Sequence, residues 1–186
     1  MNKIGQTTLQ RLFLVERLPE PLTPASSHLQ IYDNYLEQTR IRLRQVRDPY
    51  SNTWTRILQQ LIPAVAGEFS VYNIAEMYLN EAEFTAFERL PGLELRKNRY
   101  FHEFDQASFV FDVYLGRLRG LHMAKVDFED REQMDGFVPP RLAIFEVTND
   151  AFFSGASLAE KTFVEIQTEV ARIGSITPIA AESADE

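Results

Sequence analysis

The chain has 186 residues and no cysteine, which excludes disulfides, thiolate metal sites and a cysteine nucleophile. Its hydrophobic content of 45%, with 14 phenylalanines, is typical of a folded protein, and the length fits one domain with a substantial core. Acidic residues outnumber basic ones by 27 to 19, which argues against a broad nucleic-acid-binding face.

Targeting signals are not evident in the sequence. No run approaches the roughly 20 apolar residues of a membrane span, and the first residues lack the apolar stretch of a signal peptide. The absence of cysteine fits the cytoplasm, which is the expected location. We expect one domain over residues 1–176, followed by an acidic, disordered tail over residues 177–186.

Short strands dominate the predicted elements. In chain order, strands are predicted over residues 9–15, 31–36, 39–46, 71–79, 93–104, 107–115, 121–128 and 141–148. The segment 52–61 fits a strand or a helix. Asn80 is predicted to cap a helix over 81–90, and Ser157 to open a second helix that ends at Gly174. The spacing of strands and turns predicts a barrel or a sandwich.

Basic residues alternate along two of the predicted strands. Side chains on a strand point to opposite faces with a period of two, so Arg40, Arg42 and Arg44 share one face. Lys97 and Arg99 repeat the pattern on another strand. Like charges about 6 Å apart repel by roughly 3 kcal/mol at an effective dielectric of about 20, so neighbouring acids or an anionic ligand are expected. Guanidinium groups suit bidentate phosphate binding, although a solvated sheet face is the plain alternative.

Three acids on predicted strands, Glu76, Asp127 and Glu146, are candidate ligands for Mg²⁺ or Mn²⁺, which prefer carboxylate oxygens. Surface positions are the simpler interpretation of each acid alone. The histidines have no metal-ligand spacing among themselves, and the sequence contains no glycine-rich phosphate loop and no nucleophile elbow.

Four short motifs occur in an order that resembles the CYTH superfamily, the triphosphate tunnel metalloenzymes. The segment 31–36 leads into Arg40-Ile41-Arg42, which is similar to the family's RxR strand, and 97–100 is similar to its KxRY strand. The segment 111–121 resembles a family hairpin, and 146–150 resembles its closing EVTxD segment. The likeness runs from about residue 8 to residue 160.

The resemblance implies an α+β fold in which an antiparallel, roughly eight-stranded barrel forms a tunnel with flanking helices. In that family, basic residues bind a triphosphate inside the tunnel and acids hold one or two divalent metals. Carried over, the implied phosphate-binding residues are Arg40, Arg42, Lys97, Arg99 and Lys125. The implied metal-facing residues are Glu76, Asp127 and Glu146, and the cofactor is Mg²⁺ or Mn²⁺.

The chain departs from the family pattern at its signature. The N-terminal ExExK positions are Thr8, Gln10 and Leu12, so both glutamates and the lysine are missing. Tyr78 and Lys125 each replace a further acid. Together these changes would make the tunnel about four charge units more positive than the family pattern, which favours an anion and disfavours a divalent metal.

Three functions remain open from the sequence. The first is a protein that binds a polyphosphate-like or organic phosphate ligand with weak or no hydrolysis, because metal-assisted phosphoryl transfer needs the missing carboxylates. The second is a divergent metal-dependent triphosphatase, and the third is a protein-interaction scaffold with no ligand. The partner expected for the first two is an anionic, phosphate-containing small molecule, without membrane or nucleic-acid binding.

Some side chains have alternative assignments. Arg44 could lie at the rim, Arg56 could match a family lysine, and Lys125 could pair with a neighbouring acid. Arg11 alternates with Gln10 and Leu12 and is expected to point outside. Acids elsewhere, such as Glu103 or Glu129, could replace the missing metal ligands.

Overall fold

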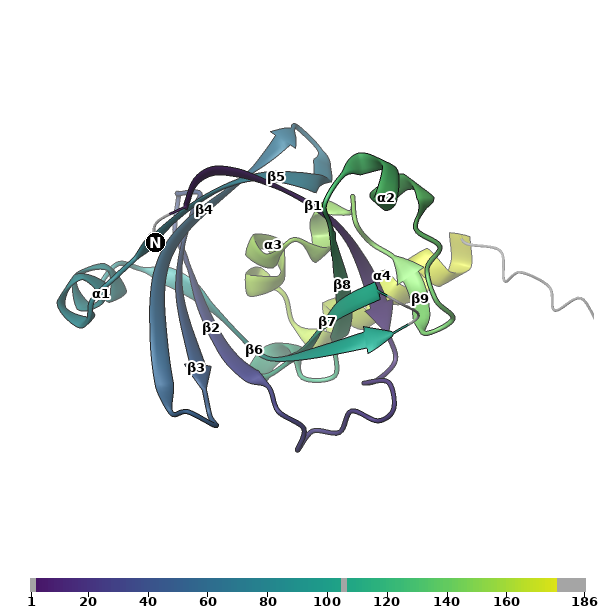
Figure 1. The fold of residues 1–186 in the computed structure, drawn as a ribbon, viewed down its shortest axis with the longest axis horizontal. Helices are drawn as coiled ribbons and strands as arrows, with labels where there is room; N and C mark the ends of the chain where they lie inside the picture. The colour runs from purple at the N-terminus through teal and green to yellow at the C-terminus, as the bar shows by residue number, and fades with distance from the viewer. Residues whose placement is uncertain (1–2, 105–106, 177–186) are drawn as a thin grey trace, which may run out of the picture.

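A closed antiparallel β-barrel forms the body of the protein in the computed structural model, which describes residues 3–104 and 107–176. Eight strands close the ring in the order β5-β4-β3-β2-β6-β7-β8-β1, and β1 pairs back onto β5. Figure 1 shows these strands curving around the centre of the molecule. The strands of the ring are β1 (Lys3–Val15), β2 (Leu29–Leu36), β3 (Ile41–Asp48), β4 (Thr53–Val65), β5 (Glu68–Tyr78), β6 (Gly92–Phe104), β7 (Ala107–Tyr114) and β8 (His122–Phe128).

The long strand β1 closes the barrel by changing partner along its length. Its first part pairs with β5 as far as Leu9, and from Leu9 onward it pairs with β8. The edge that β5 leaves is taken by a short additional strand, β9 (Ala143–Glu146), in which Glu146 lies opposite Phe13. Each barrel strand thus finds two hydrogen-bonded neighbours, which leaves no open sheet edge within the ring.

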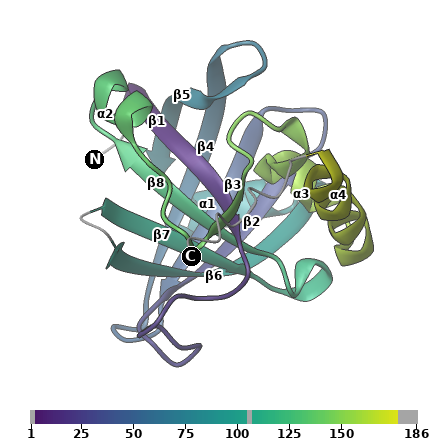
Figure 2. The ribbon, with the colours of Figure 1, turned by 90° about the vertical axis from the view of Figure 1, so that its right-hand side faces the viewer.

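The helices lie in the connections between strands and after the last strand. They are α1 (Glu81–Glu88), α2 (Arg131–Gly136), α3 (Gly155–Glu160) and α4 (Phe163–Ile176), with short 3₁₀ turns η1 (Gly116–Leu118) and η2 (Ala151–Phe153). Asn80 caps α1 as predicted, in a capping box with Glu83. Figure 1 shows α3 in the opening of the ring of strands, and Figure 2, turned by 90°, shows both α3 and α4 at one end of the barrel. No helix in residues 3–104 and 107–176 has the length and apolar character needed to cross a bilayer.

Three hydrophobic clusters occur among the described residues; a small one joins Leu43, Leu79 and Phe84, and two larger ones support the barrel from different sides. One joins inward-facing strand residues, such as Leu14 and Met123, to Phe153, Leu158 and Ile166 from the C-terminal elements. The other cluster is aromatic and lies behind β1, β7 and β8, where Phe13, Phe109 and Phe111 are almost completely buried. Burial of one such side chain contributes about 1.5–3 kcal/mol to stability, so the clusters stabilise the barrel. Polar residues occupy the remaining part of the interior.

The structure confirms the predicted α+β barrel and corrects several boundaries. The ambiguous segment 52–61 is strand, within β4, because its residues pair with both β3 and β5. The predicted helix from Ser157 is two helices separated at Lys161-Thr162, and Gly174 lies inside α4 instead of ending it. The predicted strand 39–46 begins only at Ile41, so Arg40 precedes it. The tail predicted over residues 177–186 lies outside the described residues.

Candidate functional site

A cavity of about 720 Å³ runs through the barrel interior. Its wall includes side chains from all eight strands of the ring, β1 to β8, and from α3. Six basic side chains line it: Arg40, Arg42, Arg44, Lys97, Arg99 and Lys125. All five sequence-predicted phosphate-binding residues therefore reach one cavity, together with Arg44. Arg40 is exposed, in keeping with its place in the turn before β3.

The first charged group of the cavity is built on the pairing of β2 with β3. Asp33 lies opposite Arg44 in the register of these strands. Arg44 donates from Nε and Nη2 to the two carboxylate oxygens of Asp33, at 2.6 and 2.7 Å. Nη1 of Arg42 lies 3.7 Å from the same carboxylate. The Asp33 side chain is fully buried, so one acid holds two guanidinium groups away from bulk water.

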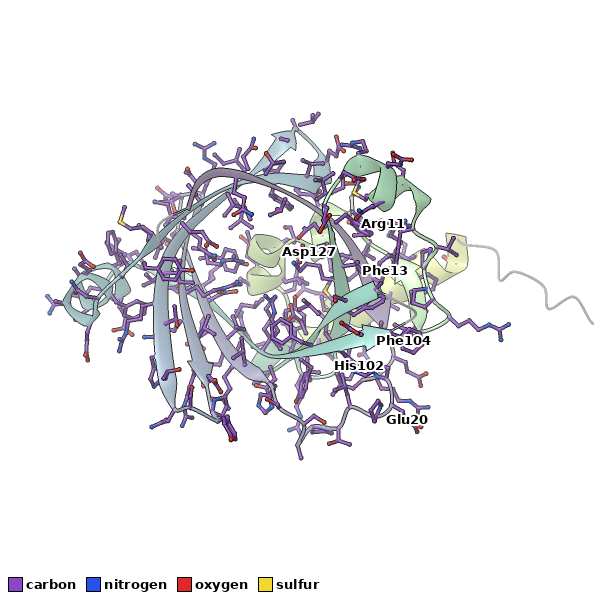
Figure 3. The ribbon with its side chains drawn as sticks, viewed as in Figure 1. Arg11, Phe13, Glu20, His102, Phe104 and Asp127 are labelled. Carbon is purple, nitrogen blue, oxygen red and sulfur yellow. The ribbon has the colours of Figure 1, made fainter. Side chains whose placement is uncertain are left out.

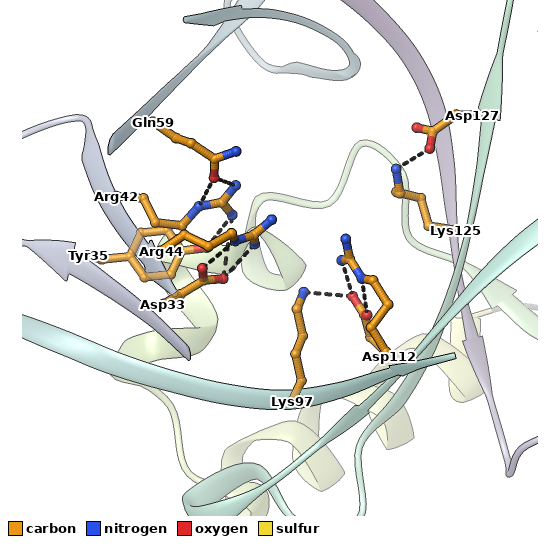
Figure 4. A network of polar contacts seen from close by, with 10 residues as sticks. Asp33, Tyr35, Arg42, Arg44, Gln59, Lys97, Asp112, Lys125 and Asp127 are labelled. Atoms are coloured by element: carbon orange, nitrogen blue, oxygen red, sulfur yellow. Dashed lines mark hydrogen bonds and ion pairs between the residues drawn. The ribbon is translucent and has the colours of Figure 1, made fainter. Parts of the chain in front are cut away.

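The second charged group is built on the pairing of β6 with β7, where Arg99 lies opposite Asp112. Arg99 donates from Nε and Nη2 to Asp112 at 2.7 and 2.8 Å. Nζ of Lys97 lies 2.6 Å from Oδ2 of the same carboxylate. Figure 4 shows the two groups facing the interior from neighbouring parts of the wall.

Burial and ion pairing shift the ionisation of these groups. Burial alone would raise the pKa of Asp33 and of Asp112, but the cations beside each carboxylate outweigh it and hold both pKa values well below the usual range. Burial is also the largest influence on Lys97 and lowers its pKa to about 8. Asp112 opposes this shift, and the positive charge of Arg99 adds to it. Lys97 therefore titrates near neutral pH.

The charge balance of the two groups is uneven. Four cations, Arg42, Arg44, Lys97 and Arg99, share the carboxylates of Asp33 and Asp112. Concentrating cations in a partly buried site is unfavourable unless an anion compensates. The arrangement thus leaves a net charge of two positive units, which an anionic ligand can neutralise.

A neutral side chain joins Arg42 to an acid farther along the wall. Oε1 of Gln59 accepts from Nε and Nη2 of Arg42 at 3.0 and 2.5 Å, and Nε2 of Gln59 donates to Glu76. Oη of Tyr35 accepts from Nη1 of Arg42 at 3.2 Å. These contacts fix the guanidinium plane of Arg42 toward the cavity.

The signature positions that departed from the family pattern do face the cavity. Thr8, Gln10 and Leu12 all line it, on the inward side of β1. In the β1–β8 register, Gln10 lies opposite Asp127 and Leu12 opposite Lys125. Lys125 forms an ion pair with Asp127, so the alternative in which Lys125 pairs with a neighbouring acid is confirmed.

Glu146 does not lie where the metal prediction required it. Its carboxylate pairs with Arg11, with Nε to Oε1 at 2.9 Å and Nη2 to Oε2 at 2.5 Å, and it is absent from the cavity wall. Arg11 also donates to the carbonyl of Phe137, so its side chain lies on the outer side of β1, toward α2 (Figure 3), and Glu146 pairs with it there. The physical reason is strand alternation: Arg11 points away from the cavity that Gln10 and Leu12 face, and draws Glu146 with it.

The carboxylates that remain do not fit a divalent metal. Glu76 is engaged by Gln59 and Asp127 by Lys125, and neither Glu103 nor Glu129 lines the cavity. Within residues 3–104 and 107–176, no three histidine, aspartate or glutamate side chains are grouped as a metal site would require. Mg²⁺ and Mn²⁺ need several oxygen ligands on one ion, which this wall does not gather.

Sequence reasoning missed the residues that organise the cations. Asp33 and Asp112 lie inside two of the family-like motifs, yet neither was singled out, and the same holds for Gln59 and Tyr35. The available signal for Asp33 was an acid that alternates with Leu29, Ile31 and Tyr35 on one face of its strand. Its partner becomes evident only from the strand register, which places Asp33 beside Arg44 and Asp112 beside Arg99.

Comparisons with known proteins support the fold. No protein-family model and no curated protein matches the sequence. Among solved structures, one described as the inorganic triphosphatase NE1496 superposes with a TM-score of 0.57 and 21% identity, covering 86% of this chain and 98% of that one. Another structure, of the hypothetical protein NE1496, gives a TM-score of 0.56 and 22% identity over 83% of this chain and 99% of that one. PH1819 from Pyrococcus horikoshii, with a TM-score of 0.49 and 12% identity over 69% of this chain and 82% of that one, is too distant to carry weight. The chain therefore shares its barrel fold with these two NE1496 structures, as the resemblance of its motifs led us to expect.

Proposed function

We propose that this protein binds a triphosphate-like, polyphosphate or organic phosphate anion in its barrel cavity, with weak or no hydrolysis. The observation that carries the proposal is the sharing of two buried carboxylates by four cavity cations, Arg42, Arg44, Lys97 and Arg99. Guanidinium and ammonium groups that line a partly enclosed cavity are donors suited to phosphate oxygens. The likeness in fold to a protein described as an inorganic triphosphatase agrees with this ligand class.

Binding without turnover is proposed because the donors for a catalytic metal are not gathered. Phosphoryl transfer relies on cations to neutralise charge that develops on the phosphate oxygens, and on a positioned nucleophile. The cavity's fixed cations serve the first need in part. The acids that could orient water, Glu76 and Asp127, are engaged by Gln59 and Lys125.

A calorimetric titration of tripolyphosphate tests the proposal, first without metal and then with Mn²⁺, with released phosphate measured in the second case. We expect saturable binding without metal and no sustained phosphate release with Mn²⁺. Metal-dependent release at a steady rate would instead make the protein a divergent triphosphatase. No binding in either condition would leave the scaffold interpretation.

The matched variants are Arg99→Gln and Arg117→Gln. Arg99 lies in the cavity beside Asp112, whereas Arg117 lies in η1 and donates to the carbonyl of Ala159. We expect Arg99→Gln to weaken tripolyphosphate binding about tenfold or more, since a charge-assisted contact contributes roughly 1.5–3 kcal/mol. Arg117→Gln should bind as the unmodified protein does. Equal affinities in the two variants would place the anion elsewhere.

A further inference from the structure

A second, apolar surface lines the same cavity. It consists of Leu61 and Pro63 on β4 with Phe69, Tyr72 and Ile74 on β5, named here the apolar wall. The β4–β5 register places Leu61 opposite Ile74 and Pro63 opposite Tyr72, and the rings of Phe69 and Tyr72 are 6.3 Å apart between centroids. These five side chains therefore form one continuous patch.

The apolar wall is not part of the protein's core. All five residues are only half-buried, and none belongs to the three hydrophobic clusters found in the described residues. Contiguous apolar surface that is left open inside a concave site marks a place where a ligand group packs. A purely inorganic anion has no group that would gain from this surface.

The apolar wall lies across the barrel from one of the charged groups and next to the other. In the ring order, β4 and β5 are three or four strands away from β6 and β7, which carry Lys97, Arg99 and Asp112. Along β4, Leu61 follows two residues after Gln59, the partner of Arg42, a step of about 7 Å at about 3.4 Å per residue. A ligand whose phosphates lie at the cations can therefore reach the patch with a group of modest size.

We propose that the ligand is a phosphate or diphosphate ester of an uncharged, apolar organic group, which packs on the apolar wall while its phosphates meet Arg42, Arg44, Lys97 and Arg99. This inference rests on the proposed function and narrows its ligand class. The cavity volume of about 720 Å³ lies within the range of roughly 300–1,000 Å³ that is usual for small-molecule sites. In such a molecule the phosphates would contact the cations and the organic group would contact the apolar wall, both within one cavity.

Calorimetric titrations with three probes, all without metal, test the inference. Geranyl diphosphate carries a branched hydrocarbon on a diphosphate, inorganic pyrophosphate lacks the hydrocarbon, and geraniol lacks the diphosphate. We expect geranyl diphosphate to bind about tenfold or more tightly than pyrophosphate, with geraniol weakest, because apolar area is buried only when the hydrocarbon is present. Equal affinity for geranyl diphosphate and pyrophosphate would overturn the inference while leaving the proposed function intact. Failure of geranyl diphosphate and pyrophosphate to bind would overturn the inference, and failure of tripolyphosphate as well would overturn the proposed function.

Variants of the apolar wall sharpen the test. Leu61→Gln should weaken geranyl diphosphate binding more than pyrophosphate binding, so that the preference for geranyl diphosphate falls about tenfold. Val65→Gln is the matched control, since Val65 lies on the same strand, is 58% exposed and does not line the cavity. If Leu61→Gln does not fold, Phe69→Ala tests the same surface by truncation. An unchanged preference in a folded variant, or binding of decanoic acid as tight as that of geranyl diphosphate, would contradict the inferred ligand.

Discussion

The ammonium group of Lys97 lies 2.6 Å from a carboxylate oxygen of Asp112, within a cavity whose wall already holds that carboxylate in a bidentate pair. A lysine with a whole acid to itself would have its charged form stabilised. Here the acid is shared with Arg99, and burial lowers the pKa of Lys97 to about 8. Because Lys97 and Arg99 share one carboxylate, a further anion in the cavity would stabilise the charged form of Lys97.

Removal of the shared acid should destabilise the protein strongly. Asp112→Asn leaves Arg99 and Lys97 buried without their partner, and breaking a buried pair from one side costs about 3–5 kcal/mol. Urea unfolding measures the free energy of unfolding. Asp127→Asn is the control and should cost less than about 1 kcal/mol, because its carboxylate is half exposed.

Tripolyphosphate should restore part of the stability lost in Asp112→Asn. A ligand that binds only the native state stabilises it in proportion to the logarithm of its concentration over its dissociation constant. The added anion compensates the two freed cations, so the variant should gain more from it than the unmodified protein does. Equal unfolding costs for Asp112→Asn and Asp127→Asn would contradict the role given to the shared acid.

The affinity for tripolyphosphate should fall as pH rises through about 8. Lys97 has a pKa of about 8 in the free protein, and a bound anion favours its protonated form. The complex therefore holds more protons than the free protein above that pH, so alkali favours dissociation. Calorimetry at pH 7 and pH 9 measures the change.

The ligand itself also titrates, so the Lys97 contribution must be isolated. In Lys97→Arg the cation stays charged over this range, and any remaining pH dependence belongs to the ligand and to other groups. The difference between the two profiles is the contribution of Lys97. Identical profiles for the two proteins would show that Lys97 does not meet the anion.

The position of Gly155 beside Tyr35 gives a test that does not alter a charge. A Cβ at residue 155 would lie 1.9 Å from Oη of Tyr35, the hydroxyl that accepts from Arg42. Gly155→Ala should cost about 1–3 kcal/mol through overpacking and should weaken anion binding by moving Arg42. Gly136→Ala is the control, since a Cβ there would meet no atom within 4 Å. An unaltered affinity in Gly155→Ala would mean that the Tyr35 contact does not position Arg42 for the ligand.

Much of the fold was predictable because its signals are local. Alternating apolar residues predicted the strands, and Asn80 as an N-cap predicted the start of α1. The cations were predictable for the same reason, since Arg42 with Arg44 and Lys97 with Arg99 each alternate along one strand. Their convergence in a single cavity followed from the family resemblance rather than from the alternation itself.

The remaining features depend on contacts between distant segments. The roles of Asp33 and Asp112 follow from strand register, which no local pattern specifies. Glu146 was wrongly assigned to the cavity because β9 pairs with the C-terminal end of β1, where Glu146 lies opposite Phe13 and forms an ion pair with Arg11. The break between α3 and α4 at Lys161-Thr162 interrupts a stripe of apolar residues that had predicted one helix.

Glutamates at the two positions that correspond to the ExExK pattern, residues 8 and 10, should introduce metal binding. In Thr8→Glu/Gln10→Glu, two carboxylates would enter the cavity wall, and residue 10 lies opposite Asp127. We expect this variant to bind Mn²⁺ about tenfold or more tightly than the unmodified protein, since Mn²⁺ prefers clustered carboxylates. Direct titration of Mn²⁺ measures the change. Thr7→Glu places a carboxylate outside the cavity and should not increase the affinity for Mn²⁺. An increase equal to that of the double variant would contradict the account.

The most direct test of the central claim is a crystal structure of the protein soaked with tripolyphosphate in the absence of divalent metal. The account predicts phosphate density inside the barrel, with oxygens within hydrogen-bond distance of Lys97, Arg99 and the guanidinium groups of Arg42 and Arg44. Phosphate density found only on the outer surface, or an unchanged cavity at saturating ligand, would contradict it.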